Sequence, residues 1–168
     1  MSHNVTPSTA SVANIAVVSV PLILGVGFLS GWLSNSGYGN EWFDALSKPS
    51  AMPPGWAFGA AWSILYVALA VVLAMVWAAV PSKARTAALA LFSVQMGLNF
   101  LWSPVFFGGH QAKLGLAVIM AILLLSLAAT RSIARVSRAA AWLMAPYLAW
   151  LGFATYLNFE IVRLNPGG

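Results

Sequence analysis

Five apolar runs, each long enough to cross a lipid bilayer as a helix, constrain this sequence more than any other feature. The hydrocarbon core of a bilayer is about 30 Å thick and a helix rises about 1.5 Å per residue, so about 20 residues span it. Lipid offers no partner for backbone N–H and C=O groups, and a helix satisfies these groups internally. The runs predict helices over residues of about 14–33, 56–80, 86–107, 114–130 and 139–162.

The composition agrees with an integral membrane protein. Apolar residues make up 61% of the chain, charged residues only 7%, and the mean hydropathy is +0.85, whereas about 25% of the residues of a soluble domain are charged. We therefore expect an all-α, multi-pass membrane protein with a single domain over residues 1–168. No Lys or Arg precedes the first run, and its apolar stretch is too long for a signal peptide, so we interpret it as a mature helix.

Few residues are available for acid–base, nucleophilic or metal chemistry. The carboxylates number three, the chain has no Cys, and its two His are far apart in the sequence. A disulfide framework, a metal site or a carboxylate pair is therefore not expected. No phosphate loop, nucleophile elbow or catalytic triad is recognisable, which argues against hydrolysis and phosphoryl transfer. We expect no metal and no required cofactor.

The basic residues lie in short runs between the apolar ones, where charges set the orientation of a membrane protein. We attribute the net charge of +5 to topology and expect no nucleic-acid partner. Five basic residues share a side with the N-terminus, against three on the other side: Lys83, Arg85, Arg131, Arg135 and Arg138 against Lys48, Lys113 and Arg163. The positive-inside rule then predicts a cytoplasmic N-terminus in a bacterial inner membrane. The run from Arg131 to Arg138 is also a candidate contact for anionic membrane lipid.

One connection is much longer than the others. The stretch SNSGYGNEWFDALSKPSAMPPG, residues 34–55, contains two of the three carboxylates, and its EWFDAL segment predicts a turn of amphipathic helix. Loops of this length in compact proteins are mostly lids or binding loops, or else disordered. We favour a lid that caps a ligand cavity between the helices.

Aromatic and polar side chains share helical faces inside three of the runs, because residues three or four apart lie one above the other on a helix. The sets are Trp62 with Tyr66, Asn99 with Trp102, and Tyr147 with Trp150 and Ala154. Trp and Tyr commonly populate the interfacial belts of membrane proteins or pack between helices. Trp62 and Trp150 lie too far from the ends of their runs to be belt residues, so a binding surface stays open as the alternative.

Asn99 and Gln95 place carboxamides at membrane depth, where their donors and acceptors need partners. A neighbouring helix or a ligand could supply them, and the sequence alone favours neither. Pro104 is expected to bend or end the third helix close to the long loop, and Pro21 and Pro146 interrupt two other runs. A gap lined by aromatic rings and a few fixed polar groups suits a small, hydrophobic, polycyclic ligand.

Small residues at a spacing of four mark close helix contacts. They occur at Gly27 and Gly31, at Gly55 and Gly59, and, on the third helix, at Ala90, Ser93 and Gly97. Packing within one chain is the simplest interpretation of each set. The set on the third helix is also the candidate interface of a homodimer.

A resemblance to a known family rests on three stretches: KPSAMPPGWAFGAAWSILY, QMGLNFLWSPVFFG and PYLAWLGFATYLNFEIVRLN. They strongly resemble the translocator protein family, also called the tryptophan-rich sensory protein or peripheral-type benzodiazepine receptor family, and the similarity extends from about Trp42 to Asn165. The resemblance implies a five-helix bundle, commonly dimeric, with a cavity under the first loop. It also implies binding of porphyrins such as protoporphyrin IX or haem, of benzodiazepine-type and isoquinoline ligands and, in some members, of cholesterol.

The resemblance implies roles for individual residues as well. Matched to the family's pocket are Trp62, Tyr66, Asn99, Trp150 and Ala154, and Trp42 matches an aromatic position of the lid. Trp102 and Tyr147 join the ligand-binding candidates on their helical spacing. In some bacterial members, tryptophans at the positions of Trp62 and Trp150 are implicated in light-dependent degradation of protoporphyrin.

The sequence departs from the family in two places. After Lys48 and Pro49, where the family usually supplies a Trp in the loop, it has Ser-Ala-Met. Near the C-terminus the sterol-recognition pattern comprises Leu157, Phe159 and Arg163, with Phe in the place of the expected Tyr.

Three functions stay open on these observations. The first is a membrane receptor, sensor or translocator that binds porphyrins and, beyond them, sterols or benzodiazepine-type ligands. The alternative is a light-dependent, porphyrin-degrading enzyme that uses Trp62 and Trp150. In the third, the aromatic residues only pack the helices of a structural membrane subunit.

Overall fold

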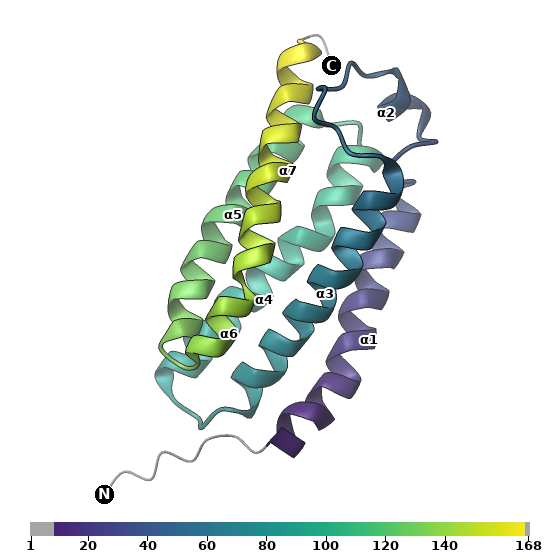
Figure 1. Ribbon diagram of the computed structural model, residues 1–168. Helices are drawn as coiled ribbons and strands as arrows, with labels where there is room; N and C mark the ends of the chain where they lie inside the picture. Colours follow the sequence, from purple (N-terminus) through teal and green to yellow (C-terminus); the bar gives the residue numbers. More distant parts are fainter. Residues whose placement is uncertain (1–8, 167–168) are drawn as a thin grey trace, which may run out of the picture.

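A computed structural model of the chain describes residues 9–166, and the secondary structure in this range is helical (Figure 1). In chain order the elements are α1 (Thr9–Leu33), α2 (Glu41–Ala45), α3 (Gly55–Ala78), α4 (Lys83–Ser103), the π-helix η1 (Pro104–Gly108), α5 (Ala112–Ala134), α6 (Arg138–Leu143) and α7 (Ala145–Leu164). Five helical spans in the described range are long and apolar enough to cross a membrane, the last formed by α6 and α7 together. The prediction of an all-α membrane bundle of five spans is confirmed.

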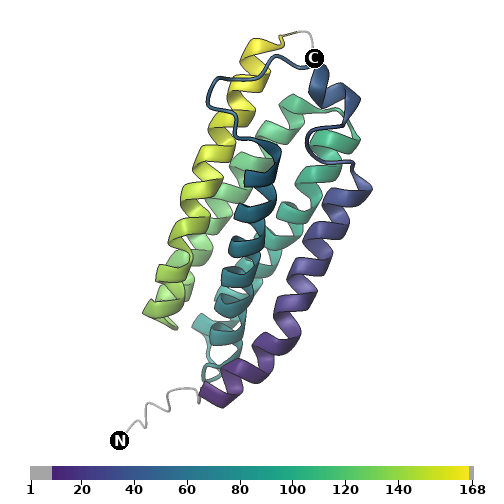
Figure 2. The same ribbon diagram turned by 45° about the vertical axis from the view of Figure 1, so that its right-hand side comes forward.

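The long helices run side by side, so their ends gather at the two ends of the bundle (Figures 1 and 2). Successive long helices run in opposite directions, and the connections between them are short except for the one between α1 and α3. The backbone of α1 packs along α3, that of α4 along α5, and that of α5 along α7, while α6 contacts α3 and α5. The α2 segment and the end of α7 lie at one end, here called the loop end, and α1 begins at the opposite end.

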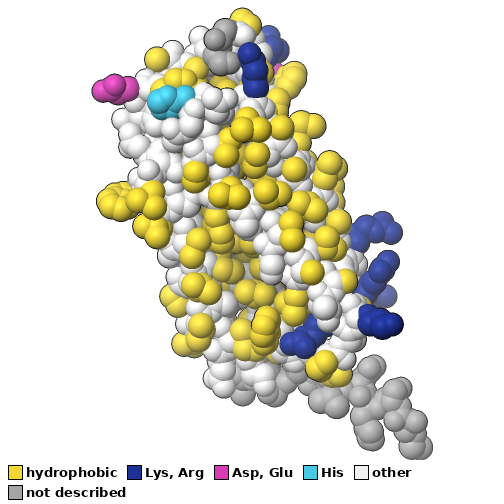
Figure 3. Space-filling view, turned by 180° about the vertical axis from the view of Figure 1, so that it is seen from behind, with side chains coloured by type: hydrophobic (Ala, Val, Ile, Leu, Met, Phe, Trp, Pro, Cys, Tyr) yellow, Lys and Arg dark blue, Asp and Glu magenta, His cyan; other side chains and the backbone are white. Residues whose placement is uncertain are grey.

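Apolar side chains cover the middle of the bundle from outside, as the bilayer requires. In the span Ser11–Leu33 the most apolar stretch has a mean hydropathy of 2.3, yet only 11% of it is buried. Its apolar side chains therefore face outward, where only lipid is a favourable solvent for them. Figure 3 shows the same arrangement on one face, with hydrophobic side chains over the middle and charged ones toward the ends.

The helices extend beyond several of the predicted boundaries, and α1 begins at Thr9 rather than at 14. α4 begins at Lys83 rather than at 86, because the Ser82 hydroxyl accepts a hydrogen bond from the Arg85 N–H at 3.2 Å and caps the helix. α5 continues to Ala134 instead of ending at 130, because Ser132 and Ile133 are buried and hold its last turn against the bundle. Charged residues at helix ends thus concealed the true boundaries in the sequence.

Two of the three prolines in the spans change the backbone. Pro104 was expected to bend or end its helix, and it opens η1, in which the Gly109 N–H donates to the Pro104 carbonyl at 2.7 Å. Pro146 lies in the first turn of α7, where its missing N–H leaves no bond unmade. The fifth predicted helix, 139–162, is therefore divided at Met144 into α6 and α7. The interruption expected at Pro21 is wrong, because this residue lies inside α1, which continues through it.

Hydrogen bonds hold the long loop in place over the loop end of the bundle. Asn40 caps α2 through its Oδ1, which accepts from the Phe43 N–H at 3.1 Å. The ammonium of Lys48 donates to the carbonyls of Phe43 at 2.6 Å, Asp44 at 3.1 Å and Leu46 at 3.2 Å. These bonds satisfy the C-terminal carbonyls of a five-residue helix that could not form alone.

The loop is also fastened to the bundle beneath it. Asn165, just after α7, accepts from the Ser47 N–H and donates to the Ser47 carbonyl, both at 2.9 Å. Phe43 is buried against Phe106 and Phe107 of η1, with ring centroids 6.3 and 5.1 Å away. The loop therefore forms a fixed cap, as predicted for a lid over the bundle.

Candidate ligand-binding site

A cavity of about 560 Å³ lies beneath the loop, between the helices of the loop end. Side chains from every long span and from the loop line it: Gly27, Phe28, Gly31, Trp32, Asn35, Ser36, Gly37, Tyr38, Phe43, Gly55, Phe58, Gly59, Trp62, Tyr66, Asn99, Trp102, Ser103, Phe107, Ile119, Ile122, Trp150, Leu151 and Ala154. Among these described residues there is no Asp, Glu, Lys, Arg or His. The cavity is thus equipped for apolar and aromatic contact and lacks an ionisable pair for acid–base catalysis.

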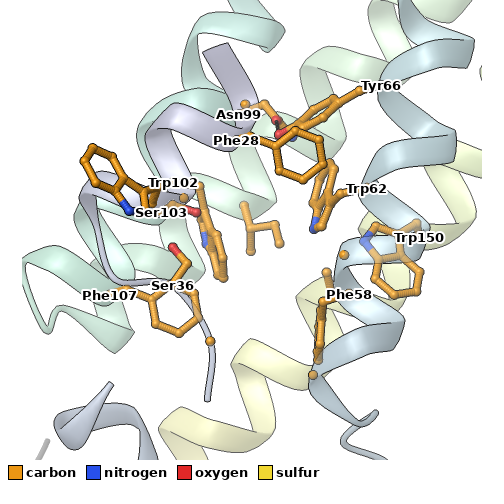
Figure 4. Close-up of a pocket in the computed structure, with 18 of the residues that line it drawn as sticks. Phe28, Ser36, Phe58, Trp62, Tyr66, Asn99, Trp102, Ser103, Phe107 and Trp150 are labelled. Atoms are coloured by element: carbon orange, nitrogen blue, oxygen red, sulfur yellow. Dashed lines mark hydrogen bonds between the residues drawn. The ribbon is translucent and has the colours of Figure 1, made fainter. Parts of the chain in front are cut away.

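One wall of the cavity is an aromatic cluster that joins α3 to α7. The indole of Trp150 meets Phe58 at a centroid distance of 5.9 Å and Trp62 at 6.5 Å, both nearly perpendicular. Trp62 in turn lies 5.1 Å from Tyr66, one turn along α3. Edge-to-face pairs of this kind are stabilising and keep the ring planes fixed. Figure 4 shows Phe58, Trp62 and Trp150 together on one side of the cavity.

The opposite wall comes from the end of α4 and from η1. Trp102 stacks on Phe106 at 4.8 Å, and its indole N–H donates to the Gly115 carbonyl at 3.1 Å. Phe107 meets Trp102 edge-on at 5.7 Å. Trp102, Ser103 and Phe107 face the α3–α7 wall across the cavity in Figure 4. A flat ligand between the two walls has aromatic surface on both sides.

The inner end of the cavity is polar. The Tyr66 hydroxyl donates to Asn99 Oδ1 at 3.0 Å, and Asn99 Nδ2 donates to the Tyr147 hydroxyl at 3.2 Å. Tyr66 and Asn99 line the cavity, and Figure 4 shows them side by side at its inner end. The two interpretations of Asn99 are therefore compatible, because its carboxamide bonds to neighbouring helices and still borders the space for a ligand.

The structure brings six of the eight predicted ligand-binding residues to the cavity wall: Trp62, Tyr66, Asn99, Trp102, Trp150 and Ala154. Tyr147 is fully buried and lies behind Asn99 rather than on the wall. Trp42 does not line the cavity, although a lid position was expected. It stacks on His110 at 4.9 Å and packs edge-on against Phe106, because the next residue of α2, Phe43, takes the inward position.

Several cavity residues were missed in the sequence. Phe58 is one helical turn before Trp62, and the spacing of four could have revealed it. Phe107 turns toward the cavity only through the π-turn of η1, which has no recognisable sequence signal. Tyr38 reaches the cavity from the loop, held by a hydrogen bond of 3.2 Å to the Pro53 carbonyl. Ser103, at the end of α4, lies on the wall as well.

The residues of the sterol pattern do not share a surface. Leu157 is buried in the bundle, whereas Phe159 is half exposed. Arg163 makes an ion pair with Glu160 at 2.6 Å. The three side chains therefore offer no common face to a sterol ring system.

Comparison with known proteins agrees with the geometry. A family model described as the TspO/MBR family matches residues 17–164, nearly the whole chain. The chain belongs to the TspO/MBR family. This confirms the resemblance found in the sequence, and the five-span bundle is consistent with TspO/MBR membership.

Individual TspO/MBR relatives align over most of their length. Protein CrtK of Rhodobacter capsulatus is 37% identical over 127 residues, which cover 75% of this chain and 79% of that protein. The tryptophan-rich protein TspO of Chlorobaculum tepidum is 36% identical over 148 residues, 88% of this chain and 93% of the relative. The translocator protein of Sus scrofa is 38% identical over 159 residues, with the same two coverages of 88% and 93%.

Proposed function

We propose that this protein is a membrane receptor or translocator that binds a porphyrin in the cavity beneath its loop. The observation that carries the proposal is the pair of facing aromatic walls, Phe58, Trp62 and Trp150 on one side and Trp102 and Phe107 on the other. Ligand pockets commonly measure about 300–1,000 Å³ and are mostly apolar with a few fixed polar groups. A cavity of about 560 Å³ falls within this range, and aromatic side chains on two facing walls favour a flat ligand.

Tryptophan fluorescence provides the test. Purified protein in detergent is titrated with protoporphyrin IX, and we expect saturable quenching, because Trp62, Trp102 and Trp150 border the cavity. The double variant Trp62→Ala with Trp150→Ala should weaken binding at least tenfold. Trp142→Ala is the matched control, since Trp142 is 78% exposed and remote from the cavity lining. Unsaturable quenching, or equal affinity in the double variant and the control, would refute the proposal.

A second candidate function is light-dependent degradation of the bound porphyrin. It is favoured by one observation: the indoles of Trp62 and Trp150 lie 6.5 Å apart on the same wall, both in reach of a ligand. The enzyme hypothesis requires that Trp62→Phe and Trp150→Phe abolish light-dependent loss of porphyrin while binding persists. Loss at the same rate in protein-free detergent would refute it.

We also propose that two copies pair through α4. Ala90, Ser93 and Gly97 are exposed and share one face of this helix, and a Cβ placed on Gly97 would meet no atom within 4 Å. Small residues allow two helix backbones to approach closely in a membrane.

For orientation, we propose a cytoplasmic N-terminus in a bacterial membrane. Five basic residues lie at the end away from the loop, in the first turn of α4 and from the last turn of α5 to the start of α6: Lys83, Arg85, Arg131, Arg135 and Arg138. Their position supports the positive-inside assignment and a contact with anionic lipid.

A further inference from the structure

The polar contacts at the inner end of the cavity continue into the bundle as a chain of hydrogen bonds. Beyond Asn99, the Tyr147 hydroxyl donates to Gln95 Oε1 at 2.8 Å, and the Ser126 hydroxyl donates to the same oxygen at 3.1 Å. Gln95, Ser126 and Tyr147 are fully buried, and Gln95 does not line the cavity. Four helical spans therefore meet through one chain that begins at Tyr66 and ends at Gln95.

The chain of hydrogen bonds from Tyr66 to Gln95 has a direction, because each link has one donor and one acceptor. Tyr66 donates to Asn99, Asn99 donates to Tyr147, and Tyr147 donates to Gln95. A tyrosine hydroxyl has one hydrogen, so the hydroxyl of Tyr66, once committed to Asn99, can only accept from a ligand in the cavity. Asn99 uses one N–H and its carbonyl in the chain whichever way its amide is turned. The direction therefore decides whether the Tyr66 hydroxyl can donate a hydrogen bond to a ligand or only accept one from it. It does not change which groups of Asn99 are left for a ligand.

Gln95 is the residue at which this direction is decided. Its Oε1 receives two hydrogen bonds, whereas its buried Nε2 has no partner in the described part of the chain. Rotating the amide by half a turn would replace the two accepted bonds by two donated ones, to Tyr147 and Ser126, so the number of bonds stays the same. Tyr147 would then donate to Asn99, Asn99 to Tyr66, and the Tyr66 hydrogen would point to the ligand.

We propose that Gln95 sets the direction of this chain and thereby determines whether the Tyr66 hydroxyl accepts a hydrogen bond from a bound ligand or donates one. The inference rests on the proposed ligand-binding function of the cavity. In the direction observed, the site favours a polycyclic ligand that carries an N–H donor, such as a pyrrole. Gln95 is a positioning residue, because it acts on the ligand only through Tyr147, Asn99 and Tyr66.

Isosteric tricyclic compounds test this directly. Carbazole presents an N–H where fluorene has a methylene group, and acridine presents a ring nitrogen acceptor where anthracene has a C–H. The ratio of Kd for fluorene to Kd for carbazole measures the preference for a donor, and the ratio for anthracene to acridine measures the preference for an acceptor. In the wild-type protein we expect a donor ratio of about five, the effect of one net hydrogen bond. The acceptor ratio should be lower, because the chain must first reverse.

The decisive variant is Gln95→Met combined with Ser126→Ala. Methionine has nearly the volume of glutamine, and removing Ser126 as well leaves the Tyr147 hydroxyl without either acceptor at that end. Tyr147 is buried and must donate elsewhere, so it turns to Asn99 and the chain reverses. The donor ratio should fall to about one while the acceptor ratio rises to about five. Each tricyclic compound partitions into the detergent micelle to the same extent whichever variant is present, so this partition cancels when the Kd ratios of two variants are compared.

One control separates direction from packing. Ser126→Ala alone keeps Gln95 Oε1 as the acceptor of the Tyr147 hydroxyl and should keep the wild-type ratios. If the methionine variant does not fold, Tyr147→Phe replaces it, because it cuts the chain and should also lower the donor ratio. A donor ratio that is unchanged, or a parallel fall of both ratios, would overturn the inference. Tricycles that protoporphyrin IX does not displace would refute the porphyrin proposal instead, while the ratios would still decide on Gln95.

Discussion

The packing of Gly27 in α1 against Tyr66 in α3 leads to a prediction. A Cβ on this residue would lie 2.2 Å from Tyr66 Cε2, 2.7 Å from Cζ and 2.9 Å from Cδ2, against about 3.5–4.0 Å for a comfortable carbon contact. The Tyr66 ring has little freedom to retreat, because it packs on Trp62 and Phe100 and its hydroxyl is bonded to Asn99. Gly27→Ala must therefore push α1 away or displace Tyr66 from the cavity wall.

The magnitude follows from a comparison with Gly25→Ala. A Cβ on Gly25 meets nothing within 4 Å, and both substitutions gain the same helix propensity, about 1 kcal/mol. The difference between them isolates the overpacking at Tyr66, about 1–3 kcal/mol. For a chain of this size each kcal/mol shifts Tm by about 2–4 °C, so Gly27→Ala should unfold about 2–12 °C below Gly25→Ala.

The assay is thermal unfolding of both variants in the same detergent, followed by far-ultraviolet circular dichroism, with protoporphyrin affinity measured in parallel. Gly27→Ala should also bind more weakly, because Tyr66 moves. In a protein that also carries Tyr66→Leu, Gly27→Ala should lower Tm much less, since the aromatic atoms that the new Cβ would meet are gone. Equal Tm values for the two alanine variants, or an undiminished penalty in the leucine background, would show that the contact does not limit the packing of α1.

Two further predictions concern the loop and the exposed face of α4. Lys48→Met removes three hydrogen bonds to the carbonyls at the end of α2 and should raise the protoporphyrin dissociation rate several-fold in stopped-flow measurements. Lys113→Met, whose ammonium donates to the Pro166 carbonyl at 3.2 Å, is the control, and equal rates for the two would contradict the role of Lys48. Gly97→Leu should lower the dimer fraction measured by cross-linking or light scattering, because a large side chain keeps two helix backbones apart. Gly152→Leu, at an exposed glycine of α7 with equally open space, should leave the dimer intact, and equal losses would exclude α4 as the interface.

Periodicity predicted the spans and part of the cavity wall, because both depend on local spacing. Trp62 and Tyr66 lie on one face of α3 in any helix that contains them, and so do Asn99 and Trp102 on α4. Trp42 shows where this stops. α2 has only five residues and is held by its cap and by Lys48, so contacts with distant residues decide which of its side chains points inward. That side chain is Phe43 rather than Trp42.

Hydrogen-bond partners between helices were beyond sequence reasoning for a different reason. A carboxamide in an apolar span requires partners, and Gln95 and Asn99 could be identified as such residues. Which hydroxyls satisfy them depends on the rotation and depth of α3, α5 and α7, which are set by packing. An interruption at Pro146 was expected, but not that the span would divide into α6 and α7 at Met144, since a proline in a first helical turn and one that kinks a continuous helix look alike in the sequence.

The paired hydrogen bonds between Asn165 and Ser47 have a practical consequence for handling the protein. They tether the cap to the last turn of α7, the helix that also carries Trp150, so a pull on that end acts on the roof and the wall of the cavity at once. We therefore expect an affinity tag or fluorescent protein joined just after this position to crowd the contact that holds the cap and to change the measured ligand-exchange rates. A fusion ahead of α1 lies at the opposite end of the bundle and should leave these rates unchanged.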